Sequence, residues 1–172
     1  MFEGLIDAVM AFVRQNAALI EIVLFALAFL ESIILTSWLV PSTVIFVGIG
    51  ALAGADGGVL AGLVIAGALG SFAGDLASYA LGRRLSGELP RMWPISKHPA
   101  VLMRAEDFFR KWGLLAVLVA KFVGPLRPIV PMLAGTSRHR IDHFAAASAA
   151  ASLTWSSVVL VPAYYGAKVV AG

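Results

Sequence analysis

The chain contains three long stretches without a charged side chain, at residues 32–55, 57–74 and 144–167. A helix needs about 20 mostly apolar residues to cross the hydrocarbon core of a bilayer. With the apolar residues that flank them, these stretches predict three crossings, at about 17–38, 57–82 and 144–167. The first predicted crossing contains two carboxylates, Glu21 and Glu31.

Two other apolar segments, residues 39–55 and 112–135, are interrupted by residues that disfavour a continuous helix. Proline lacks the backbone donor of a helix interior and glycine weakens a helix. Segments of this kind favour a re-entrant path, in which the chain enters the membrane and returns to the same side. The residues expected to shape the two hairpins are Pro41, Gly54, Gly124, Pro125, Pro128, Pro131 and Gly135.

The two halves of the chain resemble each other, because each has a broken apolar segment that ends in Leu-Ala-Gly, at 52–54 and 133–135, and is followed by a crossing. Such a pattern is typical of inverted repeats in transporters. It predicts an all-α integral membrane protein with two oppositely oriented re-entrant helical hairpins, surrounded by transmembrane helices and interfacial amphipathic helices. We expect one membrane domain over 1–172, divided into an amphipathic N-terminal helix (1–16), a first half (17–82), a basic loop (83–111) and a second half (112–172).

Composition and charge support the membrane assignment. The chain has 172 residues, of which 60% are hydrophobic and 13% charged, and its mean hydropathy is +0.90. Seven of its 13 Lys and Arg residues fall within 83–111, which also contains a predicted short amphipathic helix at about 100–112. Cytoplasmic loops are rich in such residues, so this loop is predicted to be cytoplasmic, and the basic balance does not indicate a nucleic-acid partner. The chain has no cysteine, hence no disulfide or thiolate metal site.

Ionisable residues inside membrane segments are costly and usually mark function. Glu31 and Asp75 are candidates for proton coupling, and Tyr79, one helical turn after Asp75, is placed to donate to it. Arg127 lies between Pro125 and Pro128 and stays charged wherever it lies, which suits recognition of a phosphate or carboxylate. Lys121 is a second candidate for substrate binding.

Each of these residues also has a purely structural interpretation. Glu31 can form an ion pair with Lys121 or Arg127, and Asp75 can serve only in pairing. Lys121 can extend its ammonium group to the interface. Glu21, near the start of its run, is expected at the interface.

Other chemistry is poorly supported. The sequence has no nucleophile elbow, phosphate-binding glycine-rich loop or zinc-protease motif, so we expect neither an enzyme nor a cofactor. His139 and His143 have the spacing of a metal pair but only Asp142 beside them, and we assign no metal site. Small residues four apart, at Gly58, Gly62, Ala66, Gly70 and Gly74, allow close helix approach, which suits a homodimer or internal packing equally.

An ordered set of residues makes the chain resemble the DedA family of bacterial membrane proteins, which share the VTT domain with eukaryotic lipid scramblases. The set runs from Glu31 to Gly166 and comprises Glu31, Pro41, Ala51-Leu52-Ala53-Gly54, Gly74-Asp75, Tyr79, Leu81-Gly82-Arg83, Lys121-Phe122, Gly124-Pro125, Arg127, Pro131, Ala134-Gly135, Phe144, Trp155 and Gly166.

The resemblance implies two re-entrant hairpins that meet near the membrane midplane and a carrier of lipids in the bacterial inner (cytoplasmic) membrane. Family members resemble carriers of undecaprenyl phosphate linked to the proton gradient, and others are implicated in phosphatidylethanolamine movement. This chain departs from the family pattern twice. Ser42-Thr43 stands where the family commonly has Gly-Asp, and Lys121 stands where it commonly has arginine.

Together these observations predict a flippase for an anionic lipid phosphate, with Arg127 and Lys121 as the phosphate site. Its partners would be membrane lipids and, if transport is coupled, protons. Two alternatives remain open: an energy-independent phospholipid scramblase, for example of phosphatidylethanolamine, and a membrane assembly factor that does not transport.

Overall fold

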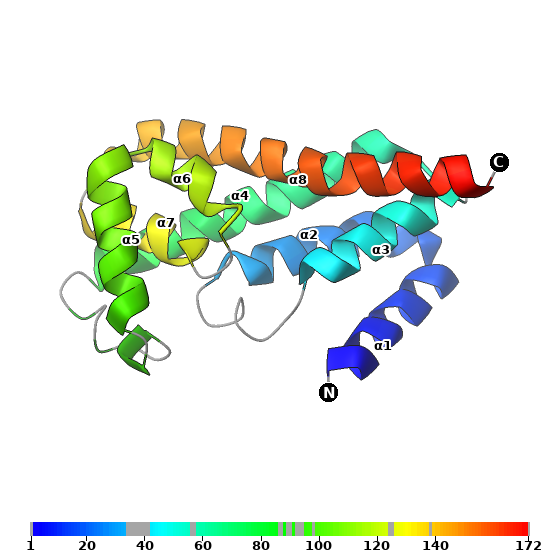
Figure 1. The fold of residues 1–172 in the computed structure, drawn as a ribbon, viewed down its shortest axis with the longest axis horizontal. Coiled ribbons are helices and arrows are strands. Elements are labelled where there is room, and N and C mark those ends of the chain that lie inside the picture. Colours follow the sequence, from blue (N-terminus) through cyan, green and yellow to red (C-terminus); the bar gives the residue numbers. More distant parts are fainter. Residues whose placement is uncertain are drawn as a thin grey trace.

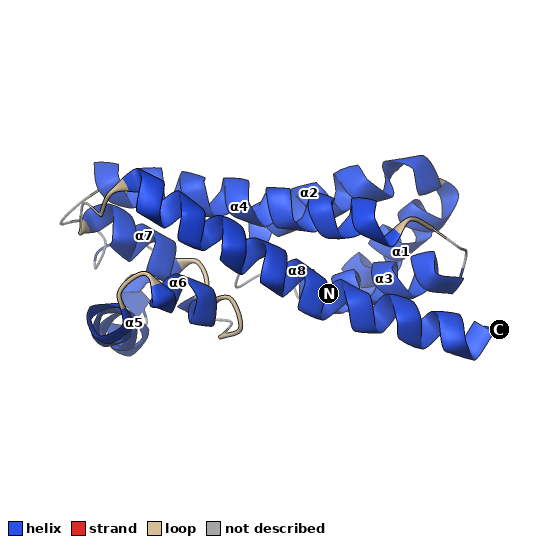
Figure 2. Ribbon diagram, turned by 90° about the horizontal axis from the view of Figure 1, so that it is seen from above, coloured by secondary structure: helices blue, strands red, loops and turns tan. Residues whose placement is uncertain are grey.

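The computed structural model describes residues 2–33, 42–55, 58–85, 88, 91, 95–97, 99–123, 126–137 and 139–171. Within these residues every regular element is helical (Figure 2), which confirms the all-α prediction. The elements are α1 (Phe2–Gln15), the 3-10 helix η1 (Ala17–Leu19), α2 (Ile20–Glu31), α3 (Ser42–Ala55), α4 (Leu60–Arg84), the 3-10 helix η3 (Ile95–Lys97), α5 (Pro99–Trp112), α6 (Leu115–Ala120), α7 (Ile129–Thr136) and α8 (Ile141–Ala171).

The two longest helices, α4 and α8, are long and apolar enough to cross a membrane. At 1.5 Å per residue, 25 and 31 residues give lengths of about 37 and 46 Å, against about 30 Å for the hydrocarbon core. They run antiparallel, since Asp75 is bonded to Ser148 while Gly67 lies against Ser156. The second and last predicted crossings fall on these helices.

The helices of the first half before α4 are short. With 12 and 14 residues, α2 and α3 span only about 18 and 21 Å. The sequence predicts one crossing as far as Trp38, but α2 ends at Glu31 and a turn follows. The helix stops where its polar end, Glu31 and Ser32, reaches the charged interior described below. Residues 34–41, which include Pro41, lie outside the described part of the chain.

The second half also has short helices before its long helix, namely α6 with six residues and α7 with eight. Helix α6 ends at Ala120 and α7 begins at Ile129, both within the predicted re-entrant segment. Pro128 caps α7 and Pro131 lies in its first turn, where the missing backbone donor has no intrahelical partner to lose. Gly124 and Pro125 lie outside the described residues.

The short helices pack across the two halves, α3 along α8 and α7 along α4, as Figure 1 shows. Two apolar clusters form around them. One includes Val13 of α1, Phe46 of α3 and Leu160 of α8, and the other includes Phe109 of α5 and Met132 of α7. The polar residues of the next subsection lie between these clusters. Outward faces of the long helices carry exposed apolar side chains such as Ile65 and Val158.

Candidate functional site: a buried cluster of charges

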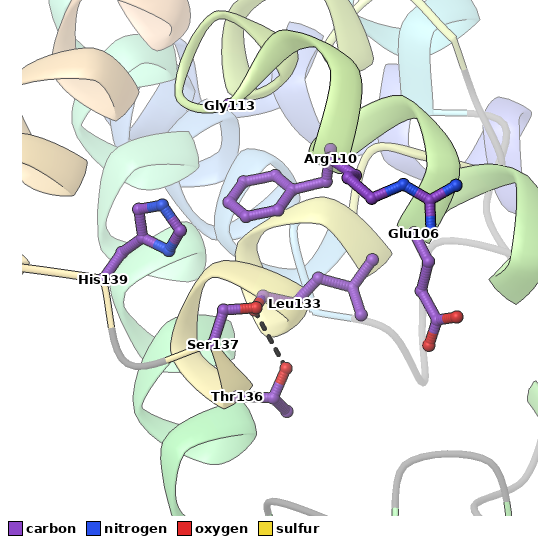
Figure 3. A pocket seen from close by; sticks show the side chains of 8 residues that line it. Glu106, Arg110, Gly113, Leu133, Thr136, Ser137 and His139 are labelled. Atoms are coloured by element: carbon purple, nitrogen blue, oxygen red, sulfur yellow. Dashed lines mark hydrogen bonds between the residues drawn. The ribbon is translucent and has the colours of Figure 1, made fainter.

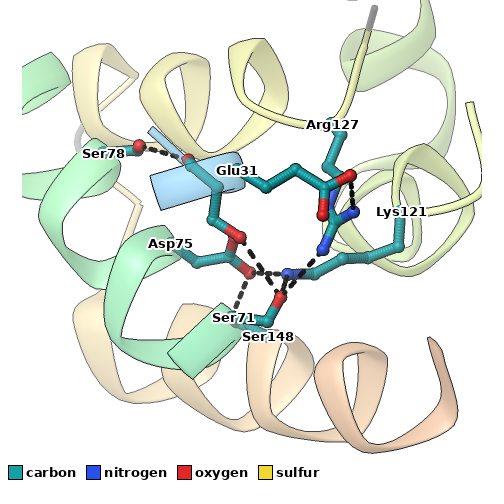
Figure 4. A network of polar contacts seen from close by, with 8 residues as sticks. Glu31, Ser71, Asp75, Ser78, Lys121, Arg127 and Ser148 are labelled. Atoms are coloured by element: carbon teal, nitrogen blue, oxygen red, sulfur yellow. Dashed lines mark hydrogen bonds and ion pairs between the residues drawn. The ribbon is translucent and has the colours of Figure 1, made fainter. Parts of the chain in front are cut away.

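Four ionisable side chains from distant parts of the sequence meet in the interior (Figure 4). Glu31 is the last residue of α2, Asp75 lies in the middle of α4, Lys121 caps α6, and Arg127 lies just before α7. Their side chains are between 0% and 11% exposed. Three of these residues therefore lie at the ends of short helices, and Asp75 reaches the same interior from the continuous helix α4.

The cluster contains two ion pairs. Arg127 Nη1 lies 2.5 Å from Glu31 Oε1, and Lys121 Nζ lies 2.7 Å from Asp75 Oδ2. With two cations and two carboxylates the cluster is neutral when all four are charged. Removing one partner of a buried pair leaves an uncompensated charge and typically costs about 3–5 kcal/mol.

Serine hydroxyls connect the two pairs. Lys121 Nζ donates to Ser71 Oγ at 2.5 Å, and Arg127 Nη2 makes a longer contact of 3.4 Å to the same oxygen. Ser71 Oγ also lies 3.2 Å from Ser32 Oγ. On the other side, Ser148 of α8 donates to Asp75 Oδ2 at 2.6 Å. Ser71 therefore joins the two ion pairs into one network.

Trp155 of α8 supplies the apolar wall of the site. The Arg127 guanidinium carbon lies 3.9 Å from the centroid of the Trp155 ring, a cation–π contact worth about 2 kcal/mol when it is shielded from water. Phe46 of α3 packs against the same ring with a centroid distance of 5.0 Å. One face of Arg127 is thus covered, while Nη1 and Nη2 point toward the polar partners Glu31 and Ser71.

Several polar atoms of the cluster retain unused capacity. Glu31 Oε2, Asp75 Oδ1 and Arg127 Nε are buried without a hydrogen-bond partner among the described residues. Buried polar groups normally have partners, so each exception requires an explanation. Either carboxylate oxygen is suited to take up a proton, whereas Arg127 Nε–H is suited to donate to a phosphate oxygen.

The structure brings together the four residues that the sequence singled out, Glu31, Asp75, Lys121 and Arg127. It gives Glu31 the ion pair with Arg127 that was one interpretation of its position. Lys121 does not extend to the interface, because its side chain is 1% exposed and bound to Asp75. The expected bond from Tyr79 to Asp75 is wrong: the Tyr79 hydroxyl donates to the His139 carbonyl, and Ser148 and Lys121 occupy Asp75 instead.

Close backbone approach explains two of the predicted hairpin glycines. A Cβ added at Gly54 would lie 2.1 Å from the Tyr164 carbonyl oxygen, and one at Gly135 would lie 2.1 Å from that of Tyr79. Pro128 and Pro131 are buried at the start of α7. Among the described residues no three potential metal ligands converge, and His139 packs its ring edge-on against Phe109.

Sequence reasoning missed Trp155, Ser71 and Ser148 as members of the site. Trp155 stands in a long apolar run, where an aromatic residue usually means packing. The serines carried a usable signal, because Ser148, Ser152 and Ser156 recur every four residues on α8 and all are buried. A polar stripe on one face of an apolar helix indicates a polar partner on the facing element.

The fold and the site together describe one class of protein: a helical membrane protein whose interior contains two buried ion pairs. Comparison with known proteins identifies the family. The model of the VTT domain matches residues 40–165, most of the chain. The chain therefore belongs to the VTT-domain family, the DedA family of membrane proteins.

Relatives agree with this assignment. Inner membrane protein YabI of Escherichia coli K12 is 32% identical over 151 residues, which are 88% of this chain and 59% of that protein. Uncharacterized membrane protein BU139 of Buchnera aphidicola is 26% identical over 152 residues, with coverages of 88% and 59%. Inner membrane protein YohD of E. coli is 30% identical over 109 residues, with coverages of 63% and 56%. The chain spans about three fifths of the length of these curated relatives. No solved structure matches it significantly.

Proposed function

We propose that this chain carries an anionic lipid phosphate, of which undecaprenyl phosphate is an example, across a bacterial inner membrane. The observation that carries the proposal is the Arg127 guanidinium, 3% exposed, stacked on Trp155 and paired with Glu31. A planar guanidinium recognises phosphate through paired hydrogen bonds. Lys121, bonded to Ser71 in the same network, supplies the second positive charge.

The same proposal includes two re-entrant hairpins as oppositely oriented members of an inverted repeat in a multi-pass protein. One is α6–α7; the other is α2–α3, which extends the predicted segment 39–55 to include the helix predicted as part of the first crossing. Two features support it. All four helices are shorter than the roughly 30 Å hydrocarbon core, and each half places its second short helix on the long helix of the other half. The end of α2 and the break between α6 and α7 both reach the charged cluster, which corresponds to the site of transporters built in this way.

Charge balance suggests how substrate and protons exchange. The cluster is already neutral, so a phosphate that binds Arg127 adds negative charge to a buried site. Burying unbalanced charge is unfavourable, and the imbalance is removed if Glu31 takes up a proton as it releases Arg127. Asp75 stands in the same relation to Lys121. One anion at a time then satisfies each cation, and lipid movement is linked to proton movement.

The lipid tails require no polar path. The exposed apolar side chains of α4 and α8, among them Ile65, Leu69 and Val158, offer a surface that hydrocarbon can follow. Only the phosphate, whose charge makes unassisted crossing slow, needs the interior cluster. This division of the substrate between protein and lipid suits a carrier for long-chain lipids.

A second candidate, an energy-independent phospholipid scramblase, is favoured by one observation. Position 43, where the family commonly has an acidic residue, is Thr43, and its side chain is exposed rather than part of the cluster. With one fewer carboxylate, the chain has less means of linking protons to lipid movement. A scramblase would move ordinary phospholipids and ignore a pH gradient.

Exchange of the two charges tests the proposal against a purely structural role. The variants are Glu31→Gln, Arg127→Ala and the double exchange Glu31→Arg with Arg127→Glu, each assayed for lipid-phosphate movement in proteoliposomes and for thermal stability. If the pair only holds the hairpins together, the exchange restores both stability and function. The proposal expects restored stability without transport, because the cation then lies on α2 and away from Trp155. Wild-type transport by both single variants would contradict it.

A further inference from the structure

A pocket of about 460 Å³ lies between α5 and the C-terminal end of α7, and Figure 3 shows the side chains that line it. The charged cluster lies at the other end of α7, where Arg127 precedes the helix. The side chains of α5 form one side of the pocket, and the end of α7 with the turn before α8 forms the other. Gly113, whose φ of 54° suits glycine, makes the turn between α5 and α6 at its edge. The pocket lies next to α5, at the basic end of the molecule.

The lining combines hydrogen-bond donors with an apolar wall. Arg110, Thr136, Ser137 and His139 supply the polar groups, and the buried side chain of Phe109 contributes to the wall. His139 Nδ1 is buried without a hydrogen-bond partner among the described residues. The Thr136 hydroxyl already donates to the Leu133 carbonyl at 2.9 Å. The Arg110 guanidinium, the Ser137 hydroxyl and the His139 imidazole, at an amphipathic edge, suit a phosphate ester whose other end is hydrocarbon.

Arg110 can be recruited to a ligand at little cost. Its guanidinium lies 2.6 Å from Asp107, but the two side chains are 81% and 68% exposed. Exposed ion pairs of this kind contribute about 0–1 kcal/mol. The central pair of Arg127 and Glu31 is buried and cannot be opened so easily. A phosphate can therefore bind at Arg110 without proton uptake, in contrast to the interior cluster.

We infer that this pocket is a second phosphate site, which holds the headgroup of a membrane lipid at the basic face of the protein. This inference rests on the proposed function only where it places the pocket on a path for transported lipid. Binding of a phosphate in the pocket does not involve Arg127. Phe109 and Leu133 make the pocket selective for a lipid over free phosphate, because they contact the first apolar part of the ligand. Glu106 at the rim opposes an anion and limits affinity.

The test uses the full chain, labelled with ¹⁵N-histidine, in phosphatidylcholine nanodiscs titrated with dioctanoyl phosphatidic acid. We expect the ring nitrogens of His139 to shift while those of exposed His143 stay in place. Arg110→Ala weakens the apparent affinity by about tenfold or more, as expected for a charged hydrogen bond. Arg104→Ala, an exposed arginine of the same helix outside the pocket, is the matched control and leaves the affinity unchanged.

The direction in which one further variant changes the binding affinity identifies the charge of the ligand. Glu106→Gln removes a negative charge from the rim and should tighten binding of the lipid phosphate; weaker binding would show that a cationic group occupies the pocket. Equal affinity for inorganic phosphate would overturn the lipid assignment. An unmoved His139, or equal losses in Arg104→Ala and Arg110→Ala, would overturn the site.

Arg127→Ala separates this inference from the proposed function. The His139 response should persist in that variant, and its loss would mean that the signal came from the central cluster and would overturn the pocket. Intact binding at His139 by a chain that moves no lipid would refute transport and leave the pocket site standing.

Discussion

At the scale of single residues, Arg127 owes its orientation to groups on three helices. Trp155 of α8 covers one face of the guanidinium, Glu31 at the end of α2 binds its edge, and Ser71 of α4 contacts a second nitrogen. The C-terminal end of α2 carries partial negative charge, which favours a cation beside it. Replacing Glu31 by a phosphate at the same edge would keep the stacking contact unchanged.

Trp155 is therefore expected to position Arg127 for the substrate. Trp155→Leu removes a cation–π contact of about 2 kcal/mol and should raise the half-saturating concentration of lipid phosphate by roughly 10- to 30-fold. Trp155→Phe keeps an aromatic face and should stay within about threefold of wild type. Transport assays across a series of lipid concentrations, with melting temperatures measured in parallel, provide the check. Equal half-saturation in Trp155→Leu and wild type, with only the melting temperature lowered, would limit Trp155 to packing.

Lys121 and Asp75 should behave as a coupled pair in stability measurements. Lys121→Met and Asp75→Asn each leave a buried charge without its partner and should lower the free energy of unfolding by about 3–5 kcal/mol. The double variant removes both charges and should recover most of that loss. Unfolding in mixed detergent micelles measures all three variants. Additive losses in the double variant would show that the two residues act independently.

At the scale of elements, the short helices reach the long ones through residues without bulky side chains. A Cβ added at Gly70 of α4 would lie 2.2 Å from the Phe25 carbonyl oxygen, and one at Gly74 would lie 2.6 Å from that of Phe29. Contacts with backbone atoms cannot be relieved by rotating a side chain. The row of small residues predicted to permit helix approach is thus used, at these positions, for packing against α2.

Gly70→Ala should push α2 away from α4 and lower the free energy of unfolding by about 1–3 kcal/mol, as overpacking does. Gly166→Ala is the matched control on α8, since Gly166 is exposed and nothing lies within 4 Å of the added Cβ. The control should stabilise the protein by up to about 1 kcal/mol through helix propensity. Thermal unfolding of both variants decides the matter, and a Gly70→Ala protein as stable as wild type would contradict the described packing.

Breaks in helices were predictable from sequence where proline marks them. The three prolines between 125 and 131 located the interruption before α7. The end of α2 at Glu31 was not predictable in this way, since Ser-Ile-Ile-Leu follows it and suits a longer helix. At that end the Glu31 carboxylate is bound by Arg127, a residue far along the chain, and local propensity contains no information about such a partner.

At the scale of the whole molecule, charge is distributed unevenly between the two ends. The end formed by α5 carries the exposed cations Arg104, Arg110 and Lys111, and Arg83 and Arg84 terminate α4 there. The opposite end, with the turn before α4, exposes Val59. The positive-inside rule predicts that the α5 end faces the cytoplasm.

Single cysteines test this orientation, because the chain has no cysteine of its own. Ser96→Cys lies in the exposed part of the basic segment, and Val59→Cys lies at the other end of α4, where Val59 is 72% exposed. A membrane-impermeant maleimide should label Val59→Cys in intact cells and Ser96→Cys only after permeabilisation. The reverse pattern would place the basic segment outside.

Whether a site residue could be recognised from the sequence depended on its residue type. Charged residues are conspicuous in an apolar sequence, so the sequence alone identifies Glu31, Asp75, Lys121 and Arg127. Their pairing was only partly predictable, since either cation could serve either carboxylate. Trp155 looks like an ordinary residue of an apolar helix, and the serine spacing on α8 indicates a polar face without naming its partner. Only the fold shows that Trp155 contacts Arg127 and that Ser148 contacts Asp75.

The most direct test of the account follows lipid phosphate in proteoliposomes that contain the purified chain and undecaprenyl phosphate, with and without an imposed pH gradient. The account predicts that phosphate becomes accessible on the far side faster when the gradient is present. Arg127→Ala should slow this movement by about 30-fold or more, as loss of a buried charged contact of about 2 kcal/mol or more implies, while Arg104→Ala retains it. Wild-type movement by Arg127→Ala would contradict the central claim, and movement of all phospholipids regardless of the gradient would identify a scramblase.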